Sequence, residues 1–403
     1  ASEATLLPLL QRSDLAAYRT RAFALAILGT FLTRSGVVSS VHAFGSGPVG
    51  PAFLAFFVLV VLFSFGLLAT RWEDVKDRAE LDSLVSREGS LLGVNVLFLA
   101  LTFAVLLGTL FPLIVEAISG DRVTVGPPFF DQVTLPLWLL VLLLMGIGPL
   151  LPWRKAEEQS LRRNLAWMLG GLVVAGGLAW LLGVRKVYPM LTVGLAGYNV
   201  VSLGLLLSGA LVPRMRLAQR PALQVLRSYA HENRRRVGSM IVHFAVVVIA
   251  VGVAFSSGYR VDEQVRVDLG DSVAFEGYTL TPTELFVDPT AARVSAGAIV
   301  EVRRDDRLVA TLRPRINVFG GSSRAIPTPD VLYTPWHDVY LNVNSAITPD
   351  TTFVILRVVK SPLVTWIWVG GLILVLGTAY ALGGATRRVA ARVSVPAAAR
   401  EAS

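Results

Sequence analysis

The chain has 403 residues, of which 54% are hydrophobic and only 16% charged, and its formal net charge is +9. This balance is typical of an integral membrane protein and excludes an ordinary water-soluble globule. The lack of cysteine excludes disulfides, thiolate metal sites and CxxC redox pairs, and a basic excess in a membrane protein indicates cytoplasmic loops rather than nucleic-acid binding.

Runs of about 20 apolar residues predict about eight transmembrane helices. They lie at 22–42, 50–70, 91–115, 133–151, 165–184, 190–212, 238–257 and 363–383. The arginines and lysines concentrate in four segments on one side of this arrangement: 71–88, 154–163, 213–237 and the tail from 387 onwards. The positive-inside rule therefore places both termini in the cytoplasm.

Residues 258–362 are the one sizeable segment outside the predicted helices, and this topology places them on the outer face. Apolar and polar residues alternate through "AIVEVRRDDRLVATLRP" (298–314), which predicts a β-hairpin that turns at Asp305-Asp306. The segments 338–344 and 351–359 predict further strands. The predicted fold is thus a polytopic α-helical membrane protein, with a small antiparallel β-sandwich or barrel inserted before the last helix.

The predicted domain division is 1–257 for seven membrane helices, 258–362 for the β domain, and 363–403 for the last helix and a basic tail. Trp366 and Trp368, at the start of the last helix, are expected to anchor it at the outer membrane interface.

Arg34 ends an unusually short apolar run. Only 12 residues separate it from Arg21, which is about 18 Å of helix against a hydrocarbon core of about 30 Å. Arg34 is therefore expected inside the outer part of the membrane, and His42 follows it, rotated by about 80°. Such a pair could hold a flat anionic cofactor, with a carboxylate on the arginine and a metal on the histidine. The alternative is a snorkelling arginine and an exposed loop histidine.

His243 lies about one and a half turns into the seventh predicted span, and an ionisable group at that depth indicates function. A neutral imidazole there is suited to ligate a metal or haem, or it is hydrogen-bonded to a neighbouring helix. His231, among cytoplasmic arginines, is expected to have no specific role, and His337, beside Trp336 in the β domain, is expected to be structural.

Several strings taken in order resemble the CcmF-type cytochrome c haem lyases of bacterial system I maturation. They are residues 28–44, 86–112, 125–150, 236–257 and 364–371, from "LGTFLTRSGVVSSVHAF" to "VTWIWVGG". The resemblance implies attachment of haem to a CxxCH peptide of apocytochrome c through thioether bonds, on the extracytoplasmic face of the bacterial inner (plasma) membrane. By the same resemblance, His42 is the axial ligand of the substrate haem and Arg34 its propionate contact, and the two form the catalytic site. His243 is then an axial ligand of a permanent membrane haem b.

The resemblance covers the later two-thirds of the family pattern, because the chain has no tryptophan-rich WWD segment and no counterpart of the first histidine of each ligand pair. The implied partners are a haem-carrying chaperone, apocytochrome c with its thioreduction and delivery proteins, and a WWD-containing part or chain.

Two other functions stay open: a membrane permease or haem exporter, and a non-catalytic assembly scaffold. The predicted spans 50–70, 133–151, 165–184 and 190–212 contain no Asp, Glu, Lys or Arg, which counts against a proton-driven permease. The sequence also contains no P-loop, HExxH or GxSxG motif.

Overall fold

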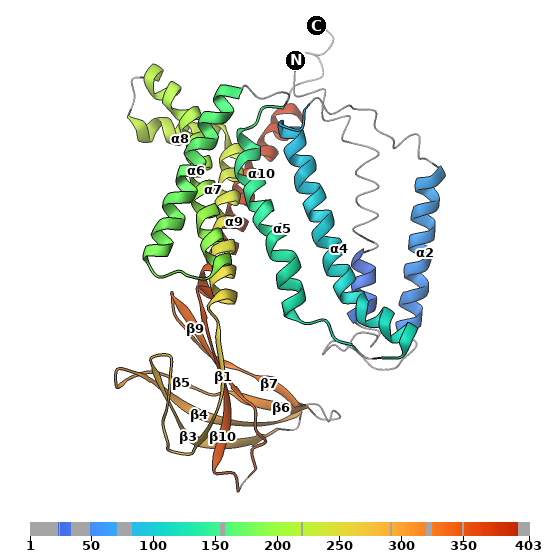
Figure 1. Ribbon diagram of the computed structural model, residues 1–403, viewed down its shortest axis with the longest axis vertical. Coiled ribbons are helices and arrows are strands. Elements are labelled where there is room, and N and C mark those ends of the chain that lie inside the picture. Colours follow the sequence, from blue (N-terminus) through green and yellow to red (C-terminus); the bar gives the residue numbers. More distant parts are fainter. Residues whose placement is uncertain are drawn as a thin grey trace. The chain divides into compact units, whose positions relative to one another are not determined.

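A computed structural model of the protein describes residues 23, 25–33, 49–70, 83–121, 123–153, 158–218, 221–290, 292–319, 325–348 and 350–393 (Figure 1). Residues 25–33 are helical. The other helices are α2 (Val49–Thr70), α4 (Arg87–Ser119), α5 (Pro127–Ile147), the short η1 (Gly148–Leu150), α6 (Glu158–Leu181), α7 (Val187–Ala218), α8 (Ala222–Glu232), α9 (Arg234–Gly258) and α10 (Val364–Val393). The chain forms two compact units: the described residues before 83 together with 98–134, and residues 83–97 together with those from 135 onwards.

Six helices within the described residues are long and apolar enough to cross a membrane: α4, α5 continued by η1, α6, α7, α9 and α10 as far as Gly383. They coincide with six of the predicted spans, which confirms the prediction of a multi-pass helical membrane protein. A seventh predicted span, 50–70, coincides with α2, whose apolar stretch Leu54–Leu67 is shorter. The first predicted span, 22–42, lies largely outside the described residues.

The segment between α9 and α10 folds into antiparallel strands, as predicted. The strands are β1 (Val261–Asp268), β2 (Val273–Phe275), β3 (Tyr278–Pro289), β4 (Arg293–Arg304), β5 (Arg307–Leu312), β6 (Arg315–Phe319), β7 (Ala325–Thr328), β8 (Asp330–Tyr333), β9 (His337–Val343) and β10 (Phe353–Pro362). One sheet has the order β1-β10-β9-β8 and the other β2-β3-β4-β6-β7, with β5 paired to β4. Together the strands form an antiparallel half-barrel placed before the last helix.

The predicted hairpin is confirmed as β4 and β5. Asp305 and Asp306 connect the strands with φ angles of 51° and 57°, and Arg304 pairs with Arg307 across the turn. Two successive residues in the left-handed region are the requirement of a type I′ turn, whose twist matches that of the strands, and Asp tolerates this conformation better than most residues.

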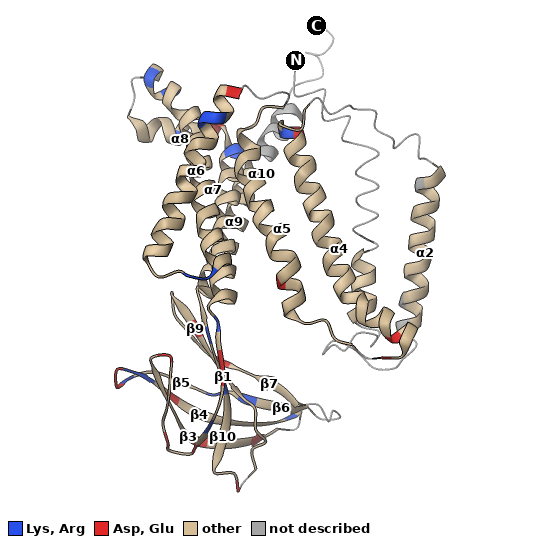
Figure 2. Ribbon diagram, in the orientation of Figure 1, with Lys and Arg blue, Asp and Glu red and all other residues tan. Residues whose placement is uncertain are grey.

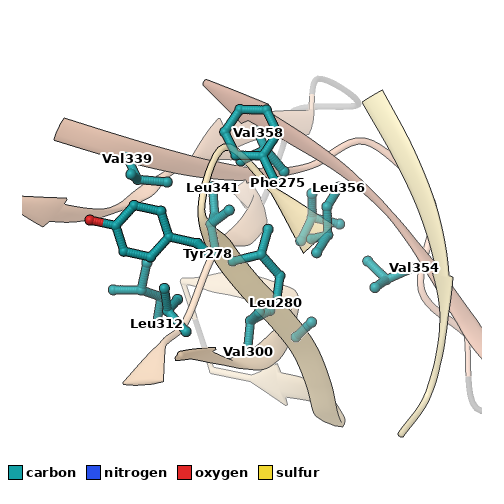
Figure 3. Close-up of a cluster of buried hydrophobic side chains, with 13 residues drawn as sticks. Phe275, Tyr278, Leu280, Val300, Leu312, Val339, Leu341, Val354, Leu356 and Val358 are labelled. Atoms are coloured by element: carbon teal, nitrogen blue, oxygen red, sulfur yellow. The ribbon is translucent and has the colours of Figure 1, made fainter. Parts of the chain in front are cut away.

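The core of the β domain consists of alternate residues of the strands of both sheets, and Figure 3 shows these side chains turned toward one another. Leu280 on β3, Val300 on β4 and Leu356 on β10 are 0% exposed. The alternation follows from the two-residue period of a strand, which directs successive side chains to opposite faces of a sheet.

The β domain is joined to α10 by three hydrogen bonds. The Leu363 N–H donates to the Trp336 carbonyl at 2.9 Å, the Thr365 hydroxyl to the Thr334 carbonyl at 2.9 Å, and the Trp366 indole to the Pro335 carbonyl at 2.9 Å. The turn before β9 is thereby fixed against the first turn of the last membrane helix. Trp368 is 75% exposed, in agreement with a position against lipid.

Helices α9 and α10 pack closely because small residues recur on both at intervals of seven. On α9 the series is Gly238, Ala245 and Gly252, and on α10 it includes Gly370 and Gly377. A Cβ atom on Gly370 would lie 2.6 Å from Ile249 Cγ1, and one on Gly377 would lie 2.8 Å from Ile241 Cγ2. In a membrane, where lipid is as apolar as leucine, such close backbone approach is a main source of helix association.

Candidate functional site

Arg34 and His42, the predicted outer pair, lie outside the described residues. The helix that precedes them is described at residues 25–33, where the Thr33 hydroxyl donates to the Gly29 carbonyl at 2.9 Å. The roles assigned to Arg34 and His42 therefore stay predictions.

His243 lies on α9, and its side chain is half-buried. It precedes Ala245 by two residues, so it is rotated by about 200° from the small-residue stripe that contacts α10. Val246 and Ala250, three and seven residues further along α9, pack against the buried cluster of Leu142, Met168, Leu195 and Tyr198. By helical spacing His243 shares their face, so it is directed away from α10 and toward the side of α9 that packs against α7.

No hydrogen bond joins the His243 ring to another residue in the described part of the chain. A neutral imidazole can form an axial bond to iron with one nitrogen and an orienting contact with the other.

Arg87 was counted from the sequence only as a loop cation, but in the folded chain its positive charge acts on the His243 ring. Arg87 is the first residue of α4, where the Ser86 hydroxyl caps the helix by accepting from the Gly89 N–H at 3.0 Å. Its backbone N–H donates to the Pro152 carbonyl at 2.8 Å, and its guanidinium lies 4.8 Å from the centre of the Trp153 ring. The beginning of α4 is thus fixed to the segment after η1.

A polar contact between α5 and α7 was also missed from the sequence. The Asn199 side-chain amide donates to the carbonyls of Leu142 at 3.0 Å and Leu195 at 2.8 Å, and the Ser202 hydroxyl donates to the Gly146 carbonyl at 2.5 Å. Tyr198 is 0% exposed, and its hydroxyl has no hydrogen-bond partner among the described residues. The three polar residues in "GYNVVS" (197–202), within an otherwise apolar span, were the available signal.

His337 has a structural environment. Its Nε2 atom is 2.8 Å from the Tyr278 hydroxyl, and Tyr278 is almost fully buried. Burial lowers the pKa of His337 below the usual 6.5, and the nearby charges of Lys360 and Arg304 lower it further. A neutral ring held by a buried tyrosine agrees with the structural role expected for this residue. His231 lies on the exposed side of α8.

Haem is the cofactor that the sequence resemblance implies, and the described residues provide one suitable ligand for it. They contain no cluster of three or more His, Asp or Glu side chains that could hold a metal ion. Of the three described histidines, only His243 lies on a predicted membrane span. The donor set therefore fits one axial position, and a second imidazole would have to come from residues outside this set or from another chain.

The sequence matches no protein-family model. It is, however, similar to individual proteins of known function. It is 32% identical over 385 residues to the cytochrome c-type biogenesis protein CcmF of Pseudomonas aeruginosa, covering 94% of this chain and 56% of that protein. It is 34% identical over 361 residues to CcmF of Escherichia coli K12, covering 88% of this chain and 53% of that protein.

A solved structure of "Cytochrome c Heme Lyase CcmF" superimposes with a TM-score of 0.69 at 32% identity, covering 92% of this chain and 55% of that one. The chain thus spans little more than half the length of the proteins it matches.

Proposed function

Because the chain belongs to the CcmF family of cytochrome c-type biogenesis proteins, we propose that it is a subunit or fragment of a cytochrome c haem lyase. In this function, haem is joined to the CxxCH segment of apocytochrome c by two thioether bonds, each formed from a peptide thiol and a haem vinyl group. The observation that carries the proposal is the half-buried His243, which has no hydrogen-bond partner among the described residues, in a chain with this family membership.

We propose that His243 is one axial ligand of a membrane haem b. Two observations support this assignment. His243 lies on the face of α9 that is turned away from α10, and the positive charge of Arg87 acts on its ring. A haem b with two imidazole ligands supplies single-electron transfer when bound. His243 would hold the iron, and Arg87, at the beginning of α4, would supply a positive charge that stabilises a propionate carboxylate.

Arg34 and His42 are proposed to hold the substrate haem, with the imidazole on the iron and the guanidinium on a propionate. The support is their spacing in the sequence and the match of "LGTFLTRSGVVSSVHAF" to the family pattern. The proposed topology has both termini in the cytoplasm and the β domain on the extracytoplasmic face. The proposed partners are a haem-carrying chaperone, apocytochrome c with its delivery proteins, and a chain or segment with the WWD motif that supplies the second ligand of each pair.

The membrane site is tested by the visible spectrum of the protein purified with its partner chain. The wild type should show the sharp ferrous bands of a low-spin haem b. His243→Ala should lose roughly 90% or more of this haem, because the substitution removes an axial ligand of the iron. The protein yield should be similar to that of the wild type. His231→Ala, on exposed α8, is the matched control and should retain full haem. Normal haem content in His243→Ala would contradict the assignment.

The outer site is tested by covalent haem on a CxxCH reporter cytochrome. His42→Ala should abolish thioether formation, whereas Arg34→Ala should weaken haem capture by roughly 10- to 100-fold, because a charge-assisted contact contributes about 1.5–3 kcal/mol. Added imidazole should partly restore His42→Gly, because it can occupy the vacant axial position, and should leave Arg34→Ala unchanged. Wild-type maturation by His42→Ala would exclude this histidine as the ligand. A colourless wild type that matures no reporter would favour the permease or scaffold.

A further inference from the structure

Helix α8 has an apolar surface wider than its contact with the protein. Val225 and Tyr229, four residues apart, are buried against neighbouring helices, and the Tyr380 hydroxyl on α10 donates to the Ala230 carbonyl at 2.7 Å. Leu223 and Leu226 lie beside this buried face, yet they are 57% and 38% exposed. At about 100° per residue, Leu223, Leu226 and Ala230 form an apolar arc of about 60° that adjoins the buried face, and its two leucines are exposed within the described structure.

Exposed arginines lie on α8 beside this arc and on the adjoining ends of α7 and α9. Arg227 follows Leu226 directly and is exposed, as are Arg216 near the end of α7 and Arg235 and Arg236 at the beginning of α9. Figure 2 shows basic residues on the ribbon in this part of the molecule. The segment 213–237 contains seven arginines and a single acidic residue, Glu232, so the surface around the arc carries a strong positive charge.

Helix α8 is held by contacts with α7 and α10. Arg214 on α7 lies with its guanidinium 4.7 Å from the centre of the Tyr229 ring on α8, and the Tyr380 hydroxyl on α10 donates to the Ala230 carbonyl of α8. Helix α8 lies between two membrane-spanning helices, α7 and α9, so it starts and ends at the same membrane surface. An amphipathic helix held there, with exposed leucines bordered by arginines, has the composition of a helix that lies in the lipid interface.

We propose that α8 is an interfacial helix that binds anionic phospholipid. Leu223 and Leu226 insert beside the acyl chains, while Arg227, Arg216 and Arg235 contact the phosphate groups. The occupant is lipid because the arc is apolar, its border is basic, and the cytoplasmic leaflet, to which the proposed topology assigns this loop, is the anionic one. The inference is independent of the haem chemistry.

The lack of native cysteine allows a direct test with the full chain in vesicles that contain phosphatidylglycerol. Single cysteines at Leu223, Leu226 and, as matched control, Ser228 on the polar side of α8 would carry a nitroxide label. Labels at Leu223 and Leu226 should collide with dissolved oxygen at least several-fold more than with a water-soluble nickel chelate, and the label at Ser228 should show the reverse. Equal access of the nickel chelate to all three positions would overturn the proposal. So would protection of Leu226 from both reagents, since that would indicate a protein partner.

The charge preference is tested by the association of spin-labelled phosphatidylglycerol relative to spin-labelled phosphatidylcholine. Arg227→Gln should lower this ratio by about fivefold, which corresponds to about 1 kcal/mol for one cation near the surface, and the Arg227→Gln/Arg235→Gln pair should lower it further. Arg307→Gln makes the same change of charge at the tip of the β4–β5 hairpin and should leave the ratio unchanged. An equal ratio in the wild type and both α8 variants would refute binding of anionic lipid.

Discussion

The β domain and the helical region are both rich in apolar residues, but they use them in opposite ways. In the β domain the large apolar side chains of the two sheets share one core, as Leu280 and Val300 of one sheet and Leu356 of the other do (Figure 3). In α10 they face outward, and Leu372 is 60% exposed. Water drives the apolar residues of the β domain together, whereas lipid provides no such drive between helices. Burial of apolar side chains thus stabilises the β domain, whereas close approach of helix backbones stabilises the helical region.

The same contrast explains why few side chains determine the arrangement around His243. Glycines and alanines fix the distance between α9 and α10, and the hydrogen bonds of Asn199 and Ser202 fix α7 against α5. The three predictions below, taken from the largest expected effect to the smallest, probe the two regions.

The largest effect is expected from the loss of apolar volume in the β core. Leu280→Ala should lower the free energy of unfolding of the β domain by about 2–5 kcal/mol, because a cavity remains where the side chain was. Leu372→Ala removes the same atoms from the outer side of α10, where lipid fills the space, and should have little effect. The measurement is pulse proteolysis of the full chain in detergent over a denaturant series. Comparable losses at the two positions would show that α10 is covered by protein and not by lipid.

An intermediate effect is expected from added volume between α9 and α10. Gly370→Ala would place a Cβ atom 2.6 Å from Ile249 Cγ1, whereas Gly371→Ala would meet nothing within 4 Å. The first should destabilise the helix pair by about 1–3 kcal/mol, and the second should be neutral or slightly stabilising because alanine favours helix. Loss of helical circular dichroism during titration with a denaturing detergent reports the difference. If both variants behave alike, the seven-residue stripe does not determine the packing.

The smallest effect is a pH dependence of the β domain. Burial and the charges of Lys360 and Arg304 lower the pKa of His337 in the folded state below 6.5, so the unfolded chain binds this proton more readily. The contribution is fully present above pH 6.5 and is lost as the pH falls below it, with a slope of no more than about 1.4 kcal/mol per pH unit. Urea unfolding at pH 7.5 and 5.5 should show a smaller difference for His337→Gln than for the wild type. An unchanged difference would exclude His337 as its origin.

Local sequence patterns were sufficient to predict most helices and strands, but not which of them pack against one another. The lengths of apolar runs predicted the helices, because a membrane span needs about 20 such residues. Alternation and Asp305-Asp306 predicted the β4–β5 hairpin, because its register depends only on neighbouring residues. The ends of the helices were less accurate: α4 begins at Arg87 and α7 ends at Ala218, beyond the apolar runs, because helix continues past the membrane surface wherever local propensity allows it.

The sequence by itself determined the membrane class, the position of the β domain before the last helix, and the depth of His243 in its span. These follow from composition, period and length, which are properties of contiguous segments. Only the tertiary structure decided which face His243 presents, that Arg87 lies near it, and that Asn199 bonds to α5, because each depends on the packing of segments far apart in the chain. The exposed leucines of α8 belong to the same group, because a helix face is free or covered only in relation to its neighbours.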